Sequence, residues 1–174
     1  LRKDVKFQNG EPFNSQTVKF AFQRAGAEKS TNKDKRLFQS MEFIGAPDPA
    51  TVVIGMKTIE PDLLFLLGQA TAIIVEPKSV DTNATQPVGT GPFKLENWAK
   101  GSAITLVKND AYRDAAKVRL KKATYRFISD PAAQVAALLA GDIDTIPRGI
   151  AAQNLKQLQA DKRFTVEIGS TAGE

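Results

Sequence analysis

The sequence predicts a mixed α/β protein in which short strands alternate with helices, most regularly in its second half. Stretches with alternating polar and apolar residues, which are typical of strands, are followed by stretches whose apolar residues recur at helical spacing. One helix has both ends marked, because Asp130-Pro131 fits a helix start and Gly141 fits a helix stop. We therefore expect a partly parallel sheet with helices on its faces.

The first half predicts a strand, then a helix, then a hairpin. Residues 1–8 alternate weakly and predict a half-buried strand, which ends at the turn dipeptide Asn9-Gly10. A helix is expected over residues 15–27, with Asn14 or Ser15 as its N-cap. The other expected elements are a hairpin of residues 41–46 and 51–58 with a turn at 47–49, a short helix at 61–67, and a buried strand at 72–75.

A polar stretch at residues 81–86 is expected to connect two subdomains, residues 1–86 and residues 87–174. The second subdomain predicts a hairpin followed by strands and helices in alternation. Its expected elements are strands at 93–98, 104–108, 123–128, 143–146 and 164–168, and helices at 131–140 and 151–159.

The composition argues against several classes of function. The 174 residues contain no cysteine and no histidine, so thiol chemistry and the commonest general base are both excluded. An enzyme would need a carboxylate, lysine or serine mechanism, and no nucleophile motif occurs in a suitable setting. The net charge of +5 comes from cations spread along the chain without interleaved aromatic residues, which favours a solvated surface over a nucleic-acid patch. No apolar run approaches the length of a membrane span.

Two motifs suggest chemistry at first, and for both we favour a structural interpretation. Gly89-Thr90-Gly91 resembles a phosphate loop, but it lacks a third glycine, and Pro92 and a strand follow it instead of a helix. We interpret it as a backbone crossing where glycines permit a positive φ or a close approach. Asp142 and Asp144 would share one face of a strand, yet no further oxygen ligands are spaced for a metal site. We therefore predict no catalytic and no metal-binding residues.

Arg148-Gly149 is a candidate for a ligand cleft. It follows an expected strand end and precedes an expected helix, and ligands in open α/β sheets bind outside the carboxyl ends of strands. Arg148 could hold a carboxylate in a bidentate manner. The alternative is an arginine that is simply exposed to solvent.

Four segments in order carry a resemblance to one family. They are residues 1–24, VGTGPFKL at 88–95, ITLVKNDAYRD at 104–114 and YRFISDPAAQVAALLAGDIDTIP at 125–147. Together they resemble the extracytoplasmic solute-binding proteins, family 5, of peptide and nickel ABC transporters. One departure is Arg113 after Tyr112, where family members often carry Trp, and we expect it to affect packing only. Family members are several times longer, so the chain resembles a fragment.

The resemblance implies one lobe of a type II periplasmic binding fold, in which ligand lies between two lobes that close on it. The chain would supply most of the N-terminal lobe, as a mixed sheet with flanking helices that is incomplete without the second lobe. The implied function is the substrate-binding component of an ABC transporter, which is no enzyme and needs no cofactor. The implied solute is a peptide, opine-like compound or nickel complex, which the protein would deliver to permease subunits. The implied location of the protein is the periplasm, or a lipid anchor outside the cytoplasmic membrane. The alternative is a solute-sensing domain of the same fold in a transcription regulator.

Strand-end geometry and the resemblance together imply where this half would contact the solute. We expect backbone groups to support a variable ligand, with Arg148 as the single charged option. Most of the affinity is expected from the opposing lobe and from the segment before Leu1. The candidate ligand-binding residues are Thr71, Ala72, Ile73, Thr90, Gly91, Pro147, Arg148 and Gly149.

Overall fold

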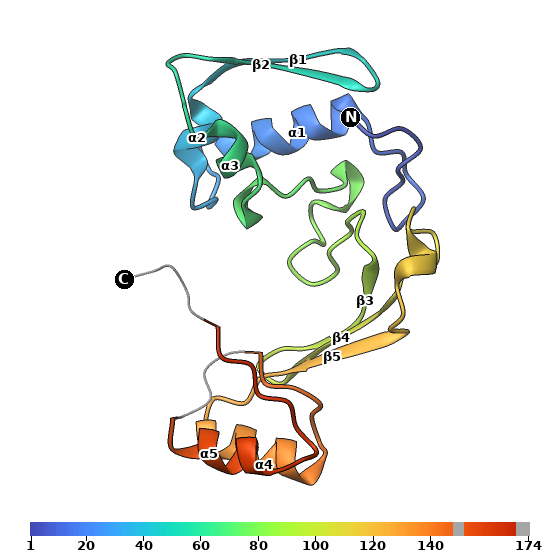
Figure 1. Cartoon of the computed structure of the whole chain (residues 1–174). Coiled ribbons are helices and arrows are strands. Elements are labelled where there is room, and N and C mark those ends of the chain that lie inside the picture. Colours follow the sequence, from blue (N-terminus) through green and yellow to red (C-terminus); the bar gives the residue numbers. More distant parts are fainter. Residues whose placement is uncertain (148–151, 170–174) are drawn as a thin grey trace. The chain divides into compact units, whose positions relative to one another are not determined.

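The computed structural model describes residues 1–147 and 152–169, and Figure 1 shows its helices and strands. The chain divides into two compact units. Unit 1 comprises Leu1–Lys100 and Ile104–Tyr125, and unit 2 comprises Gly101–Ala103 and the chain from Arg126 onward. Helices and short sheets occur together, which confirms the mixed α/β class. The subdomain boundary expected at residue 86 stays a prediction.

Helix α1, Ser15–Gly26, begins where the sequence predicts, because Asn14 caps it. The Asn14 carboxamide oxygen accepts hydrogen bonds from the backbone N–H of Gln16 at 3.0 Å and of Thr17 at 3.2 Å. In return, the Thr17 hydroxyl accepts the backbone N–H of Asn14 at 3.1 Å. This reciprocal capping box satisfies donors that the first helical turn leaves unpaired. The prediction of a helix with Asn14 as N-cap is confirmed.

Replacing Asn14 with alanine should lower the free energy of unfolding by about 1 kcal/mol, because two backbone donors lose their acceptor. Urea unfolding followed by far-UV circular dichroism measures the change. Gln16→Ala is the matched control, since Gln16 is exposed and only its backbone takes part in the cap. An unfolding midpoint of Asn14→Ala equal to that of the control would show that the cap does not stabilise the fold.

The core of unit 1 lies between α1, α2 (Lys35–Gln39) and an antiparallel hairpin, β1 (Met41–Asp48) and β2 (Thr51–Met56). Figure 1 shows the hairpin running across α1 and α2. The hairpin is confirmed, although its turn is at Pro49 and Ala50 because β1 continues through Asp48. The buried residues of this core are Val18, Phe22, Leu37, Phe38 and Met41.

The predictions of strands at residues 1–8 and 72–75 are wrong. Residues 70–72 form a 3₁₀ turn, and the chain from Ile73 is irregular, with Ile73 itself 65% exposed. Residues 1–8 contain only one isolated bridge, Lys6 to Pro12, although Phe7 is buried and meets Phe13 edge to face. A strand requires a hydrogen-bonded neighbour, and an apolar or alternating pattern does not show whether one is present. The short helix expected nearby is confirmed as α3, Leu63–Leu67.

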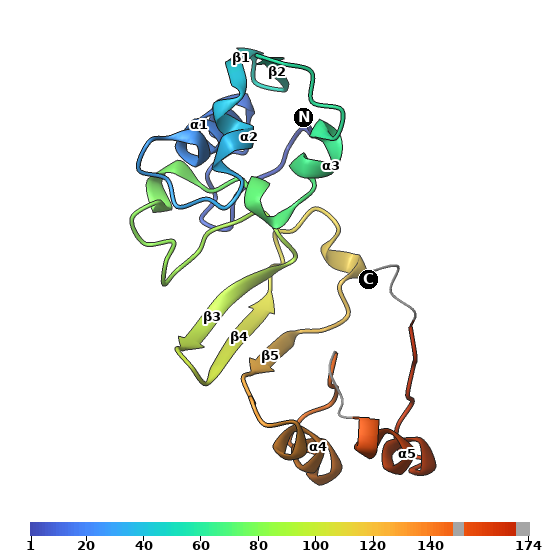
Figure 2. The same ribbon diagram turned by 90° about the vertical axis from the view of Figure 1, so that its left-hand side faces the viewer.

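A second sheet has the order β3-β4-β5, with β3 Phe93–Ala99, β4 Ala103–Lys108 and β5 Lys122–Arg126 (Figure 2). The Lys108 N–H donates to the Lys121 carbonyl and the Phe127 N–H donates to the Ser102 carbonyl, both at 2.8 Å. Residue numbers rise along β4 as they fall along β5, so this pair is antiparallel. The predicted hairpin and third strand are confirmed. Short 3₁₀ turns lie at Pro77–Ser79 and Ala115–Lys117.

Unit 2 contains α4, Pro131–Ala140, and α5, Ala152–Ala160. Asp130 caps α4 by accepting the Ala133 N–H at 2.8 Å, and Gly141 ends it in the left-handed region at φ 81°. Both helix ends were predicted. The buried residues Val135, Leu138 and Leu158 join the two helices.

The strands expected at residues 143–146 and 164–168 are wrong, because both segments are irregular. Their apolar side chains, Ile143, Ile146, Phe164 and Val166, pack against the core of unit 2, which explains the strand-like pattern. Among the described residues, neither segment has a hydrogen-bonded neighbouring strand, so the expected parallel pairing is absent there. The longest described helix, α1, has 12 residues, and none in the described ranges could cross a membrane.

Candidate functional site

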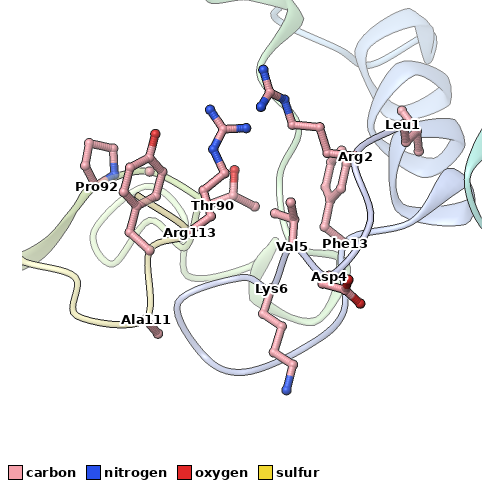
Figure 3. Close-up of a pocket in the computed structure, with 12 residues that line it drawn as sticks. Leu1, Arg2, Asp4, Val5, Lys6, Phe13, Thr90, Pro92, Ala111 and Arg113 are labelled. Carbon is pink, nitrogen blue, oxygen red and sulfur yellow. The ribbon is translucent and has the colours of Figure 1, made fainter. Parts of the chain in front are cut away.

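A pocket of about 510 Å³ in unit 1 brings together residues from three separate parts of the sequence. One side is formed by Leu1, Arg2, Asp4, Val5 and Lys6 together with Phe13, a second by Thr90 to Pro92, and a third by Ala111 to Arg113 (Figure 3). Thr90 and Gly91, two of the candidate ligand-binding residues, therefore line a pocket.

Hydrogen bonds to main-chain carbonyls hold the turn at Gly89 to Pro92 from two sides. The Gln8 backbone N–H donates to the Gly89 carbonyl at 2.9 Å, and its side-chain amide donates to the Phe93 carbonyl at 2.7 Å. From the other side, the buried Asn109 donates its side-chain N–H to the Gly91 carbonyl at 3.0 Å. The turn is thus a rigid support for Thr90.

The predicted role of the two glycines in this turn, which was to permit a positive φ or a close approach, is wrong. Neither Gly89 nor Gly91 has a positive φ, since the described glycines with positive φ are Gly10, Gly101 and Gly141. A Cβ at Gly89 would meet nothing within 4 Å, and one at Gly91 would only reach the Phe93 carbonyl at 3.9 Å. Hydrogen bonds, and not glycine backbone freedom, give this turn its shape.

The charged groups of the pocket are mostly cations. Arg2, Lys6 and Arg113 line it, whereas Asp4 is its one acidic lining residue. Figure 3 shows the guanidinium groups of Arg2 and Arg113 extending to the same side, while Lys6 extends the opposite way. Two arginines on one side favour binding of an anionic group there.

Neighbouring side chains hold Arg113 in place. Its Nε donates to the Asp114 carboxylate at 2.9 Å, and its guanidinium carbon lies 5.8 Å from the centre of the Tyr112 ring. Lys117 also donates a hydrogen bond to Asp114. The pKa of the Asp114 carboxyl is lowered from its usual value, first by the hydrogen bond from Lys117 and second by the one from Arg113. Asp114 therefore stays ionised at neutral pH and orients Arg113.

The candidate residues Thr71 to Ile73 lie elsewhere in unit 1 and do not line this pocket. The Thr71 hydroxyl donates to the Asp34 carboxylate at 2.5 Å, and the Thr71 carbonyl accepts the Asn32 side-chain N–H at 2.8 Å. These bonds connect the 3₁₀ turn at 70–72 to the loop before α2. Ile73 follows with most of its side chain exposed.

The remaining candidates belong to unit 2 or lie outside the described residues. Pro147 lines a pocket of about 610 Å³, together with Asp144 and residues 163–167. Arg148 and Gly149 fall outside the described residues. In the ranges that the structure describes, no group of three or more acidic, cysteine or histidine side chains could hold a metal ion.

Sequence reasoning missed the arginines of the unit 1 pocket. Arg2 and Arg113 are 111 positions apart, and only folding brings them to one pocket. One signal was present, because Arg113 departs from the Trp that is frequent in the resembling family. We read that departure as a packing change, whereas the structure places the side chain at a pocket.

Comparison with known protein families gives one match over the whole chain. A family model described as "Bacterial extracellular solute-binding proteins, family 5 Middle" matches residues 1–174. A Brucella ovis protein, provisionally named an ABC transporter peptide-binding protein, is 32% identical over 148 residues, which are 80% of this chain and 28% of that protein. The glutathione-binding protein GsiB of Salmonella choleraesuis is 29% identical over 146 residues, which are 82% of this chain and 28% of that protein.

Solved structures agree with these matches. The binding protein AgaA of A. tumefaciens R10, in complex with agropinic acid, has 30% sequence identity and a TM-score of 0.85. A nickel ABC transporter protein of Bacillus halodurans has 33% identity and a TM-score of 0.82. Each comparison covers 93% of this chain and 33% of the other. The chain thus spans about a third of the length of the proteins it matches.

Proposed function

Because the chain belongs to the bacterial extracellular solute-binding proteins of family 5, we propose that it forms part of the substrate-binding component of an ABC transporter. In this role the protein captures a peptide or similar small solute outside the cytoplasmic membrane and delivers it to permease subunits. The observation that carries the proposal is the family match over residues 1–174. Relatives that bind glutathione and agropinic acid support a solute of that size.

The proposed role involves binding and no catalysis. The relatives described above are binding proteins of transporters and not enzymes. The Asp114 carboxylate beside the unit 1 pocket has structural partners, since it is engaged by Lys117 and Arg113. The absence of histidine and cysteine from the sequence supports the same proposal. No observation favours the sensing domain of a transcription regulator.

The part of the site that this chain would contribute is the pocket of unit 1. Its volume is within the range of small-molecule sites, and its walls combine apolar side chains with a few polar groups. Thr90 and Gly91 are the candidate residues with a place in it. Solute contacts from the other candidates, Thr71, Ala72, Ile73, Pro147, Arg148 and Gly149, remain predictions.

Solute binding to the natural gene product that includes residues 1–174 tests this function. A panel of trialanine, glutathione, agropinic acid and the nickel–histidine complex is added while thermal unfolding is followed. A solute that binds only the folded protein raises its stability by about 2.7 kcal/mol at a concentration of 100 times Kd. We expect at least one member of the panel to raise the midpoint and to give a saturable isotherm by calorimetry.

Bovine serum albumin at the same concentration controls for nonspecific effects of each solute. If no solute of the panel shifted the midpoint or produced binding heat, the proposed function would be rejected for these solute classes. Hydrolysis of a bound peptide, followed by mass spectrometry over the same period, would contradict the non-catalytic role.

A further inference from the structure

We propose that the unit 1 pocket binds a carboxylate group of the solute, with Arg113 and Arg2 as the residues that contact it. This inference rests on the proposed function and deepens it, because it names the chemical group that the pocket recognises. The shape of the pocket, its charge and the orientation of Arg113 support it independently of one another.

The shape of the pocket suits a small organic acid. Val5, Phe13 and Pro92 supply apolar surface, and Thr90 supplies a hydroxyl on the turn that Gln8 and Asn109 hold rigid. Binding sites for small molecules combine such apolar walls with a few fixed polar groups. A bare inorganic anion would leave the apolar walls without a partner, whereas an organic acid uses both.

The charges of the pocket are not balanced within the described part of the chain. The three cationic lining residues exceed the single acidic one, Asp4, by two charges. No ion pair of the described residues involves Arg2 or Lys6. A carboxylate on the solute would supply the counter-charge, and Figure 3 shows Arg2 and Arg113 extending to the side where it would lie.

Arg113 is oriented in advance for this contact. Asp114 engages Nε, and the Tyr112 ring lies near the guanidinium, so the two terminal nitrogens are the ones left to face a ligand. No hydrogen bond within the described residues uses those two nitrogens. Paired terminal N–H groups match the two oxygens of a carboxylate. Asp114 is thus a positioning residue, and Arg113 is the contact residue.

Two replacements of Arg113 test the role of its charge. An aromatic side chain there would keep the apolar wall but remove the cation. The replacement Arg113→Trp therefore separates charge from bulk, and Arg113→Gln keeps polarity while removing the charge.

The test compares each solute with its amide. Calorimetry on the natural gene product measures trialanine against trialanine amide, and glutathione against glutathione with its glycine carboxyl amidated. We expect Arg113→Gln and Arg113→Trp to weaken binding of the acid at least about tenfold and binding of the amide less than about threefold. Lys94→Gln is the control of equal charge change, because Lys94 is exposed on β3 and outside the pocket. It should leave both affinities unchanged.

The possible outcomes separate the two proposals. Both variants should first be shown to have the circular dichroism of the wild-type protein. If Arg113→Gln and Arg113→Trp then bound the acid as tightly as the wild type, the carboxylate inference would be overturned. The solute-binding function would still stand. Equal weakening of acid and amide would also overturn it, since Arg113 would then act through packing. Competition by inorganic phosphate as strong as that of the acid would reassign the pocket to anions in general. A wild-type protein that binds no solute of the panel would reject the proposed function for these solute classes, whatever the variants do.

Discussion

Replacing Phe38 with alanine is expected to lower the free energy of unfolding of unit 1 by about 3–5 kcal/mol. Phe38 is 4% exposed, and its ring lies 5.4 Å from that of Phe22. The helix-ending Gly26 lies close against it, because a Cβ at Gly26 would approach Phe38 to 3.1 Å. Packing that is tight on two sides leaves little room for neighbours to close the cavity, so we expect a large loss.

Urea unfolding followed by the fluorescence of Trp98, the only tryptophan, measures this loss in unit 1. Phe65→Ala is the matched control, since Phe65 has the same side chain and is 70% exposed. We expect the control to change stability by less than about 0.5 kcal/mol. Similar midpoints for the two variants would mean that the cluster around Phe38 is not the core that stabilises this unit.

Replacing Leu158 with alanine is expected to lower the stability of unit 2 by about 2–5 kcal/mol. Leu158 is 1% exposed and contributes the α5 side of a core whose other buried residues, Val135 and Leu138, belong to α4. Because this core has few buried members, the loss of one branched side chain removes a large share of the contact between the two helices.

Amide hydrogen exchange of α4 measures this effect separately from unit 1. The amides of Val135 and Leu138 should exchange faster in Leu158→Ala, because opening of the helix pair costs less free energy. Ile168→Ala is the control from the same unit, since Ile168 is 73% exposed. Unchanged protection of α4 in Leu158→Ala would show that α5 does not stabilise α4.

Local signals explain which elements were predictable from the sequence. Helix α1 has its cap in Asn14, and α4 has a cap, a proline and a glycine stop within the helix and its flanking residues. The hairpins β1–β2 and β3–β4 join strands that are close in sequence, so alternation and turn residues suffice to predict them.

Local signals were not sufficient for three predicted strands, at residues 72–75, 143–146 and 164–168. Their apolar patterns are present, yet they record packing against helices and not pairing with strands. A strand depends on a partner at a distance in sequence, which no local pattern reports.

The candidate site was likewise predictable from the sequence only in part. Thr90 and Gly91 were placed by strand-end geometry and the family resemblance and line a pocket, but Thr71 is engaged with Asp34 and lies elsewhere. Arg2 and Arg113 were not identified, because nothing in the sequence links positions so far apart.

The sequence by itself determined the family and the capped helices, since ordered motifs and helix ends are local and survive in a single chain. Only the tertiary structure decided which cations share the pocket with Thr90 and which way Arg113 is held. The physical reason is that a binding site consists of side chains that are distant in sequence and close in space. Its groups are oriented only after the chain has folded, here by Asp114, Tyr112 and the hydrogen-bonded turn at residues 89–92.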